Sequence, residues 1–176
     1  MSSRPSTSAN TAIVLWAVLG VIALLSQAIV RLLPRALEPV LDGSLGALGI
    51  LAYVASIVAF AYSEGHRGFA QRFSPRVVVR ALKLAERRGW LIAIAPLMAM
   101  GLVHGTRRRL IGSWVLLGGI VTLVLLVRLL PQPWRGAVDA GVVVGLSWGV
   151  IATLVLMIKA LRGQVPDTDP ELPARA

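Results

Sequence analysis

The sequence predicts an all-α integral membrane protein with four transmembrane helices, and three observations support this fold class. Of the 176 residues, 56% are hydrophobic and 15% are charged, and the mean hydropathy is +0.77, whereas soluble domains carry about 25% charged residues. Four apolar runs of about 18 residues or more are long enough to cross a bilayer core as helices. The basic residues leave a net charge of +10 and flank these runs, which indicates control of membrane orientation rather than nucleic-acid binding.

The first two apolar runs predict a transmembrane hairpin at residues 11–62. The polar residues 1–10 before it are expected to form a disordered arm. The first run, residues 12–33, covers 22 residues, or about 33 Å of helix, which is enough to cross a core of about 30 Å. The second run covers residues 45–62 and closes the hairpin.

A basic linker is expected at residues 63–109, and it contains an amphipathic helix at residues 75–88. Ser74 and Pro75 form a helix-start signal, because serine caps free N–H groups and proline at the first helical position loses no needed donor. Cations then recur at spacings of four, three and four residues, which places them on one stripe of the helix. The stripe consists of Arg76, Arg80, Lys83 and Arg87.

This basic stripe predicts a docking surface. An amphipathic helix with cations on one face can lie along an anionic leaflet or contact a partner protein. The alternative is a solvated loop whose cations only fix the orientation of the chain. We therefore expect the partners to be anionic lipid headgroups or a protein in a membrane complex, and not a nucleic acid.

The linker ends with a short apolar segment, residues 91–103, which we do not expect to cross the membrane. It has 13 residues with Pro96 near its middle, so a re-entrant, interfacial or protein-buried segment is favoured. Without this crossing, fourteen of the eighteen basic residues lie on one side and four on the other. The positive-inside rule then predicts cytoplasmic termini in a plasma (inner) membrane. The excess of Arg over Lys, 16 to 2, is typical of a GC-rich bacterial genome.

The second hairpin is expected at residues 110–160, with a flexible tail at 161–176, and it resembles the first hairpin. The five residues Val-Arg-Leu-Leu-Pro occur at 30–34 and again at 127–131, and in both places seven residues separate the proline from an aspartate. We interpret this as an internal repeat. Because each copy crosses twice and the linker does not cross, the two hairpins form a parallel repeat.

The repeat also predicts two charge pairs at the outer face. In each copy an arginine ends the first helix and an aspartate precedes the second helix, so Arg31 is expected to pair with Asp42 and Arg128 with Asp139. A charge pair near the interface costs less than one at the bilayer centre. We favour a structural role for these pairs, and a gate for a solute or an ion is the alternative.

The last span carries a packing motif. Gly141, Gly145 and Gly149 repeat every four residues, and such a stripe of small residues lets helix backbones approach closely. No catalytic or nucleotide-binding motif occurs in the sequence, so we predict no enzymatic activity and no cofactor.

A metal site is a weaker hypothesis. Two histidines and one carboxylate can hold zinc, and Glu64, His66 and His104 are predicted to lie on the same side of the membrane. Their spacing matches no metal-binding motif, so no metal is expected.

Taken together, these features favour a small polytopic scaffold, assembly factor or accessory subunit that docks lipid headgroups or a protein through its basic cytoplasmic face. The alternative is a transporter or channel for a small solute or ion, built from the duplicated hairpins.

Overall fold

The computed structural model describes residues 7–86, 92–103 and 105–172. Within these ranges the chain is helical and has no strand, and four helical segments are long and apolar enough to cross a membrane. The predicted all-α fold class with four candidate membrane spans is thereby confirmed. The helices in chain order are α1 (Thr7–Leu41), α2 (Ala47–Phe60), the π-helix η1 (Ala61–Phe73), α3 (Ser74–Ala85), α4 (Ala95–Ala99), α5 (Arg107–Val127) and α6 (Trp134–Leu161).

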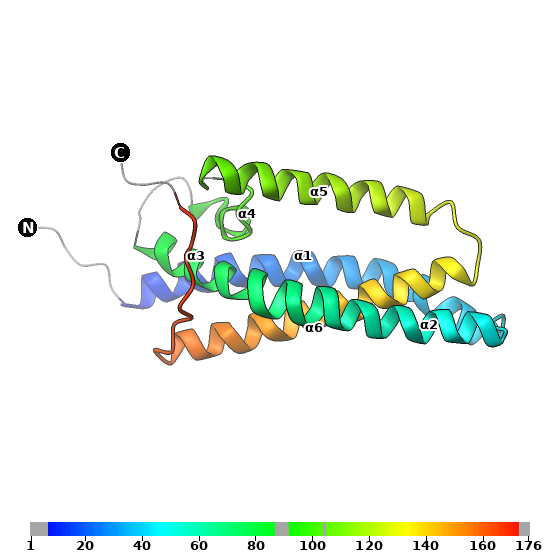
Figure 1. Cartoon of the computed structure of the whole chain (residues 1–176). Helices are drawn as coiled ribbons and strands as arrows, with labels where there is room; N and C mark the ends of the chain where they lie inside the picture. The colour runs from blue at the N-terminus through cyan, green and yellow to red at the C-terminus, as the bar shows by residue number, and fades with distance from the viewer. Residues whose placement is uncertain (1–6, 87–91, 104, 173–176) are drawn as a thin grey trace, which may run out of the picture.

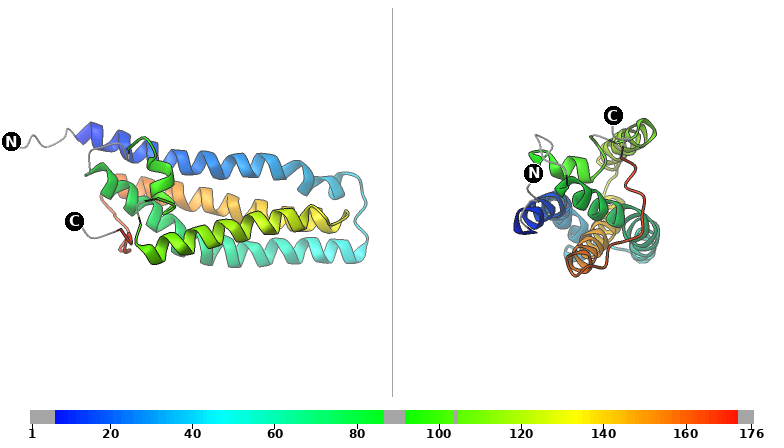
Figure 2. Two further views of the ribbon diagram at one scale, coloured as in Figure 1. Left: turned by 90° about the horizontal axis from the view of Figure 1, so that it is seen from above. Right: turned by 90° about the vertical axis from the view of Figure 1, so that its left-hand side faces the viewer.

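The long helices run side by side along one axis (Figure 1). Helix α1 begins and helix α6 ends at one end of the bundle, which we call the terminal end. The turns that follow α1 and α5 lie at the opposite end, which we call the turn end. The end-on view in Figure 2 shows α5 at the edge of the bundle, apart from α1 and α6.

The main hydrophobic core lies toward the terminal end, where α1, α3, α4 and α6 meet. Its largest fully buried apolar side chains come from α1, α3 and α4, and they include Val18, Val21, Val77, Leu84 and Met98. This core covers the apolar side of α3, and nine of the twelve residues of α3 are buried. The apolar side of this helix, which was predicted to lie along a membrane or contact a partner protein, therefore packs against other helices of the chain.

The helix of the second span does not end near residue 62, because the chain remains helical from Ala47 to Ala85. The first part of the predicted linker and its amphipathic helix are η1 and α3, which continue α2. Pro75 follows the change from π-helix to α-helix and does not break the helix, since proline needs no N–H partner where the hydrogen-bond register changes.

Helix α1 also extends beyond its predicted span. It has 35 residues and continues through Pro34 and Pro39 to Leu41, so it measures about 52 Å at 1.5 Å per residue. Pro39 is fully buried, and a Cβ atom at Gly136 in the first turn of α6 would lie 2.5 Å from its Cγ. Because the helix continues to this contact, Arg31 and Arg35 lie one turn apart on the same face of α1.

The described part of the predicted apolar segment, residues 92–103, contains the α-helix α4, which has five residues and is too short to cross a membrane. Its side chains Ala95, Met98 and Ala99 are buried. Pro96 lies against Gly20 of α1, where any Cβ atom would overlap the proline ring. Of the three expected arrangements, the segment therefore adopts the protein-buried one.

Helices α5 and α6 differ in how closely they pack. Gly141, Gly145 and Gly149 of α6 lie against α2 and η1, and a Cβ atom at Gly149 would lie 2.6 Å from the ring of Phe69. A Cβ atom at Gly118 of α5 would meet nothing within 4 Å. Most of the large side chains of α5 are exposed, so lipid or another molecule must cover them in a membrane.

Candidate functional site

Three arginines meet one glutamate at the terminal end, and we call this group the arginine–glutamate cluster. Arg76 and Arg80 come from α3, Arg109 comes from the first turn of α5, and Glu171 comes from the tail after α6. The Glu171 carboxylate lies 3.3 Å from Nη2 of Arg80, 3.5 Å from Nε of Arg109 and 3.9 Å from Nη2 of Arg76. One carboxylate therefore joins α3, α5 and the tail.

Arg80 is the buried centre of the cluster, and 2% of its side chain is exposed. Its Nε donates a hydrogen bond of 2.7 Å to the Pro170 carbonyl, and its Nη1 donates one of 3.2 Å to the Ala99 carbonyl. With the Glu171 carboxylate as third partner, all three nitrogens of the guanidinium have an acceptor. This arrangement satisfies the requirement that a buried charge be both paired and hydrogen-bonded.

Gly101 provides space for the arginine side chains. Its φ is +77°, and a Cβ atom there would lie 2.6 Å from Nη1 of Arg80 and 2.9 Å from Nε of Arg109. Glycine meets both requirements, because it adopts positive φ without strain and has no side chain. The segment after α4 thus forms one wall of the cluster.

The tail is held in the cluster by backbone contacts as well as by charge. The Glu171 carbonyl accepts a hydrogen bond of 3.1 Å from the Thr106 N–H, and the Glu171 N–H donates one of 2.8 Å to Oδ1 of Asp169. Glu171 has a φ of +51°, which is uncommon for a residue other than glycine. Leu172 packs on the main core, so this part of the predicted flexible tail has defined contacts.

The cluster has more positive than negative charge. Three guanidinium groups share the Glu171 carboxylate, and the Nε atoms of Arg76 and Arg109 are buried without a hydrogen-bond partner. Arg76 and Arg109 are nevertheless partly exposed, at 29% and 21% of their side chains. Guanidinium groups bind carboxylates and phosphates through paired N–H donors. The cluster can therefore accept a further oxyanion at its exposed side.

The structure separates the predicted docking residues. Arg80 is buried and has three internal partners, so it is not available to a ligand. Arg76 belongs to the same cluster but reaches the surface. Lys83 is half exposed and pairs with Glu86 at 3.7 Å, while Arg87 lies outside the described residues. Of the described cations of the predicted stripe, Arg80 is therefore buried, whereas Arg76 and Lys83 are accessible.

The two predicted charge pairs are not formed within the described part of the chain. Arg31 and Asp42 have no ion pair with each other, and Asp139 pairs with Arg135 one helical turn away in α6, at 3.9 Å. The pairing differs because α1 continues past Pro34, so that no turn follows Arg31. Arg31 and Arg128 instead line one cavity.

The predicted metal ligands are only partly placed. Glu64 and His66 lie on η1, and His104 lies outside the described residues. His66 contacts Nε2 of Gln71 at 3.0 Å and packs between Tyr62 and Trp148. Among the residues that the structure describes, no group of three histidine, cysteine, aspartate or glutamate side chains is arranged to hold a metal.

The fold defines a class of protein, namely a small all-helical chain with four helices long and apolar enough to cross a membrane. No protein-family model matches the sequence, and no solved structure matches the chain. Any more specific function must therefore be inferred from the charged clusters.

Sequence reasoning missed Arg109, Gly101 and Glu171 as members of the cluster. A partial signal was present, since the tail contains acidic residues while the linker is strongly basic. Opposite charges on two segments at the same end of a bundle favour contact. The sequence does not indicate which acid meets which arginine, because their separation of up to 95 positions has no local pattern.

Proposed function

We propose that this chain is a small polytopic membrane scaffold or accessory subunit that docks anionic lipid headgroups, or an acidic segment of a protein partner, at its basic terminal end. The observation that carries this proposal is the excess of positive charge in the arginine–glutamate cluster. Two of its arginines, Arg76 and Arg109, are partly exposed and share the single Glu171 carboxylate with the buried Arg80. An additional anion there would be held by charge-assisted hydrogen bonds.

The distribution of cations supports a terminal end on the cytoplasmic side of a plasma (inner) membrane. Fourteen of the eighteen basic residues belong to this side in the four-span arrangement, in agreement with the positive-inside rule. The chain has no cysteine, so one introduced cysteine gives an unambiguous topology test. Arg108→Cys in intact cells should resist an impermeant maleimide and become labelled only after the membrane is opened, and labelling in intact cells would reverse the proposed orientation.

The same arrangement supports the two hairpins as a parallel repeat, with the matched Val-Arg-Leu-Leu-Pro segments at the outer face. In this reading α3 and α4 belong to the linker between the two copies. Val40→Cys, in the first turn region, should be labelled from outside in the topology experiment. Protection of this cysteine in intact cells would argue against the repeat orientation.

The docking proposal is tested with variants of the two accessible arginines. The double variant Arg76→Gln with Arg109→Gln should retain less phosphatidylglycerol than wild type in native mass spectrometry, after reconstitution in phosphatidylcholine with phosphatidylglycerol. With each surface cation contributing about 1 kcal/mol, we expect on the order of thirtyfold weaker binding. Arg80 is kept in this variant because its loss would affect folding.

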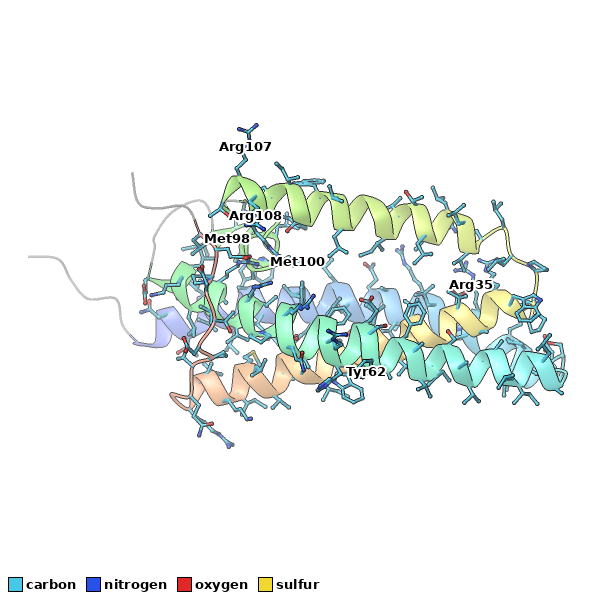
Figure 3. The ribbon with its side chains drawn as sticks, viewed as in Figure 1. Arg35, Tyr62, Met98, Met100, Arg107 and Arg108 are labelled. Carbon is cyan, nitrogen blue, oxygen red and sulfur yellow. The ribbon has the colours of Figure 1, made fainter. Side chains whose placement is uncertain are left out.

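The matched control neutralises two other exposed arginines of the same helix end, Arg107 and Arg108, which the structure places outside the cluster. Figure 3 shows Arg107 pointing away from the bundle. An equal loss of lipid in this control would show that the whole basic face acts and would contradict a specific site. If lipid binding is unchanged in the double variant Arg76→Gln with Arg109→Gln, a photo-crosslinker at Lys83 tests for a protein partner instead. Absence of a crosslinked partner would then contradict the docking function.

A further inference from the structure

The turn end contains a second charged site that does not depend on the proposed docking function. In the four-span arrangement, four of the eighteen basic residues lie outside the cytoplasmic side. All four line a single cavity between the ends of α1, α5 and α6. They are Arg31, Arg35, Arg128 and Arg135.

The cavity joins the two predicted repeats. Arg31 and Arg128 occupy the same position in the two Val-Arg-Leu-Leu-Pro segments, and the structure brings these matched arginines together rather than pairing each within its own hairpin. Arg35 lies one turn beyond Arg31 on α1, and it is labelled at this end of the bundle in Figure 3. Because the positive-inside rule disfavours arginines at an outer face, four of them at one cavity require a specific explanation.

The charge in the cavity is not balanced by the chain itself. Asp139 is the one acidic side chain in the cavity lining, and its ion pair with Arg135 is long, at 3.9 Å. Oδ2 of Asp139 and Nε of Arg135 are both buried without a hydrogen-bond partner. Glu38, the nearby acid on α1, accepts a hydrogen bond from Gln132 instead. Among the residues that line the cavity, four positive charges are therefore matched by one negative charge.

The shape and lining of the cavity identify the kind of anion that it fits. Its volume is about 240 Å³, which is below the range of about 300–1,000 Å³ for pockets that enclose a drug-sized ligand. Apart from the four arginines and Asp139, the lining residues are all apolar, and they include Leu32, Val124 and Val142. A site with this volume and these two surfaces fits a charged headgroup and the first carbons of a chain, rather than a complete soluble metabolite.

We infer that this turn-end cavity binds the phosphate group of an anionic lipid, with Arg31 and Arg128 as its principal ligands. The shared chemistry is a phosphate oxyanion, which guanidinium groups hold through paired N–H donors. A lipid headgroup and a free phosphate ion both carry this group. The lipid is the source favoured by the apolar wall.

The inference is tested by protection of a cysteine in the cavity wall. Val138 lines the cavity and the chain has no native cysteine, so Val138→Cys can be labelled with the neutral reagent N-ethylmaleimide in nanodiscs. Labelling rates are compared in phosphatidylcholine alone, in phosphatidylcholine with inorganic phosphate, and in phosphatidylcholine with phosphatidylglycerol. Val40→Cys, exposed at the same end but absent from the cavity lining, corrects for general effects of a charged surface on the thiol.

We expect phosphatidylglycerol to slow labelling of Val138→Cys saturably, without slowing labelling of Val40→Cys. Adding Arg31→Gln and Arg128→Gln should weaken this protection on the order of thirtyfold, and each single substitution serves if the double variant does not fold. Protection by inorganic phosphate as well would support the oxyanion site, whereas protection by phosphate alone would overturn the lipid assignment. Equal rates in all three conditions would overturn the site itself.

Discussion

The two ends of the bundle use the same side chain in different ways. At the terminal end, Arg80 is almost fully buried, and the chain supplies a carboxylate and two carbonyls as its partners. At the turn end, Arg31, Arg35 and Arg128 are exposed and line a cavity whose single carboxylate pairs with Arg135. A buried arginine needs partners from the chain to be stable, while an arginine without such partners remains free to bind an external anion.

This contrast also exists within the terminal cluster. Arg80 is its structural member, whereas Arg76 and Arg109 are partly exposed and make no hydrogen bond through Nε. Stability should therefore depend mainly on Arg80. Anion binding should depend on the other two.

The largest expected effect is the loss of stability in Arg80→Met. This change leaves the carbonyls of Ala99 and Pro170 without their donor, while Glu171 keeps its ion pairs with Arg76 and Arg109. An acceptor left unsatisfied in the interior costs about 1–3 kcal/mol. Thermal unfolding in detergent, followed by circular dichroism, should show a clearly lower Tm.

Two control substitutions test whether the loss of stability is specific to the buried arginine. Lys83→Met removes a half-exposed cation on the same helix, and Arg31→Met removes an exposed one at the turn end. Both should change Tm little, because surface ion pairs contribute at most about 1 kcal/mol. If Arg80→Met were no less stable than these controls, the distinction between the two ends would be lost.

The next effect compares two glycines with positive φ, one at each end. Gly101 has a φ of +77° and faces the arginine heads, while Gly43 has a φ of +64° and has no atoms in the space of a Cβ. Gly43→Ala should cost about 1–2 kcal/mol from backbone conformation alone. Gly101→Ala adds overlap with Arg80 and Arg109, for a total of about 3 kcal/mol.

The measurement is the difference between the two alanine variants in denaturant or thermal unfolding. It isolates the space that the arginine–glutamate cluster requires, because both variants carry the same conformational strain. Equal destabilisation would mean that the arginine side chains move aside without cost. The cluster would then be less rigid than the contacts of Gly101 indicate.

The sequence predicted the helical class and the four candidate spans because hydrophobic length is a strong local signal. It did not predict that helices continue through Pro34, Pro39 and Pro75, since tertiary contacts, such as that of Pro39 with Gly136, compensate for the helix-breaking tendency of proline. The start of the predicted linker, residues 63–73, is mostly polar but helical, and glycines of η1 and α6 make close contacts between these two helices.

The charged sites were predicted less well than the spans. The spacing of Arg76, Arg80 and Lys83 correctly predicts that they lie on one helix. It does not indicate which of these side chains is buried by the rest of the chain. The repeat marked Arg31 and Arg128 as related residues. Their shared cavity depends on how the two hairpins pack, which a match within the sequence does not specify.

A smaller effect is expected at the internal carboxylate of the terminal cluster. Glu171→Gln removes the negative charge that an external anion must compete with, so retention of phosphatidylglycerol should rise about fivefold for one charge near the surface. Native mass spectrometry of the reconstituted protein measures this retention. Asp167→Asn is the control, because Asp167 is an exposed acid of the same tail without an ion pair among the described residues.

The opposite result, lower lipid retention in Glu171→Gln, would mean that the carboxylate positions Arg76 and Arg109 for the ligand rather than competing with it. The docking surface would then need the tail in place.

The smallest effect is expected for Asp139→Asn in the turn-end cavity. Asp139 opposes four arginines and forms only a long ion pair with Arg135, so it neutralises a smaller share of the local charge than Glu171 does. Removing its charge should strengthen the protection of Val138→Cys by phosphatidylglycerol, by about twofold, which is less than one full surface charge provides. If protection falls instead, Asp139 must orient Arg135 toward the phosphate. An internal carboxylate would then be part of the anion site at the turn end, and the two ends would differ in the position of their acid rather than in their charge balance.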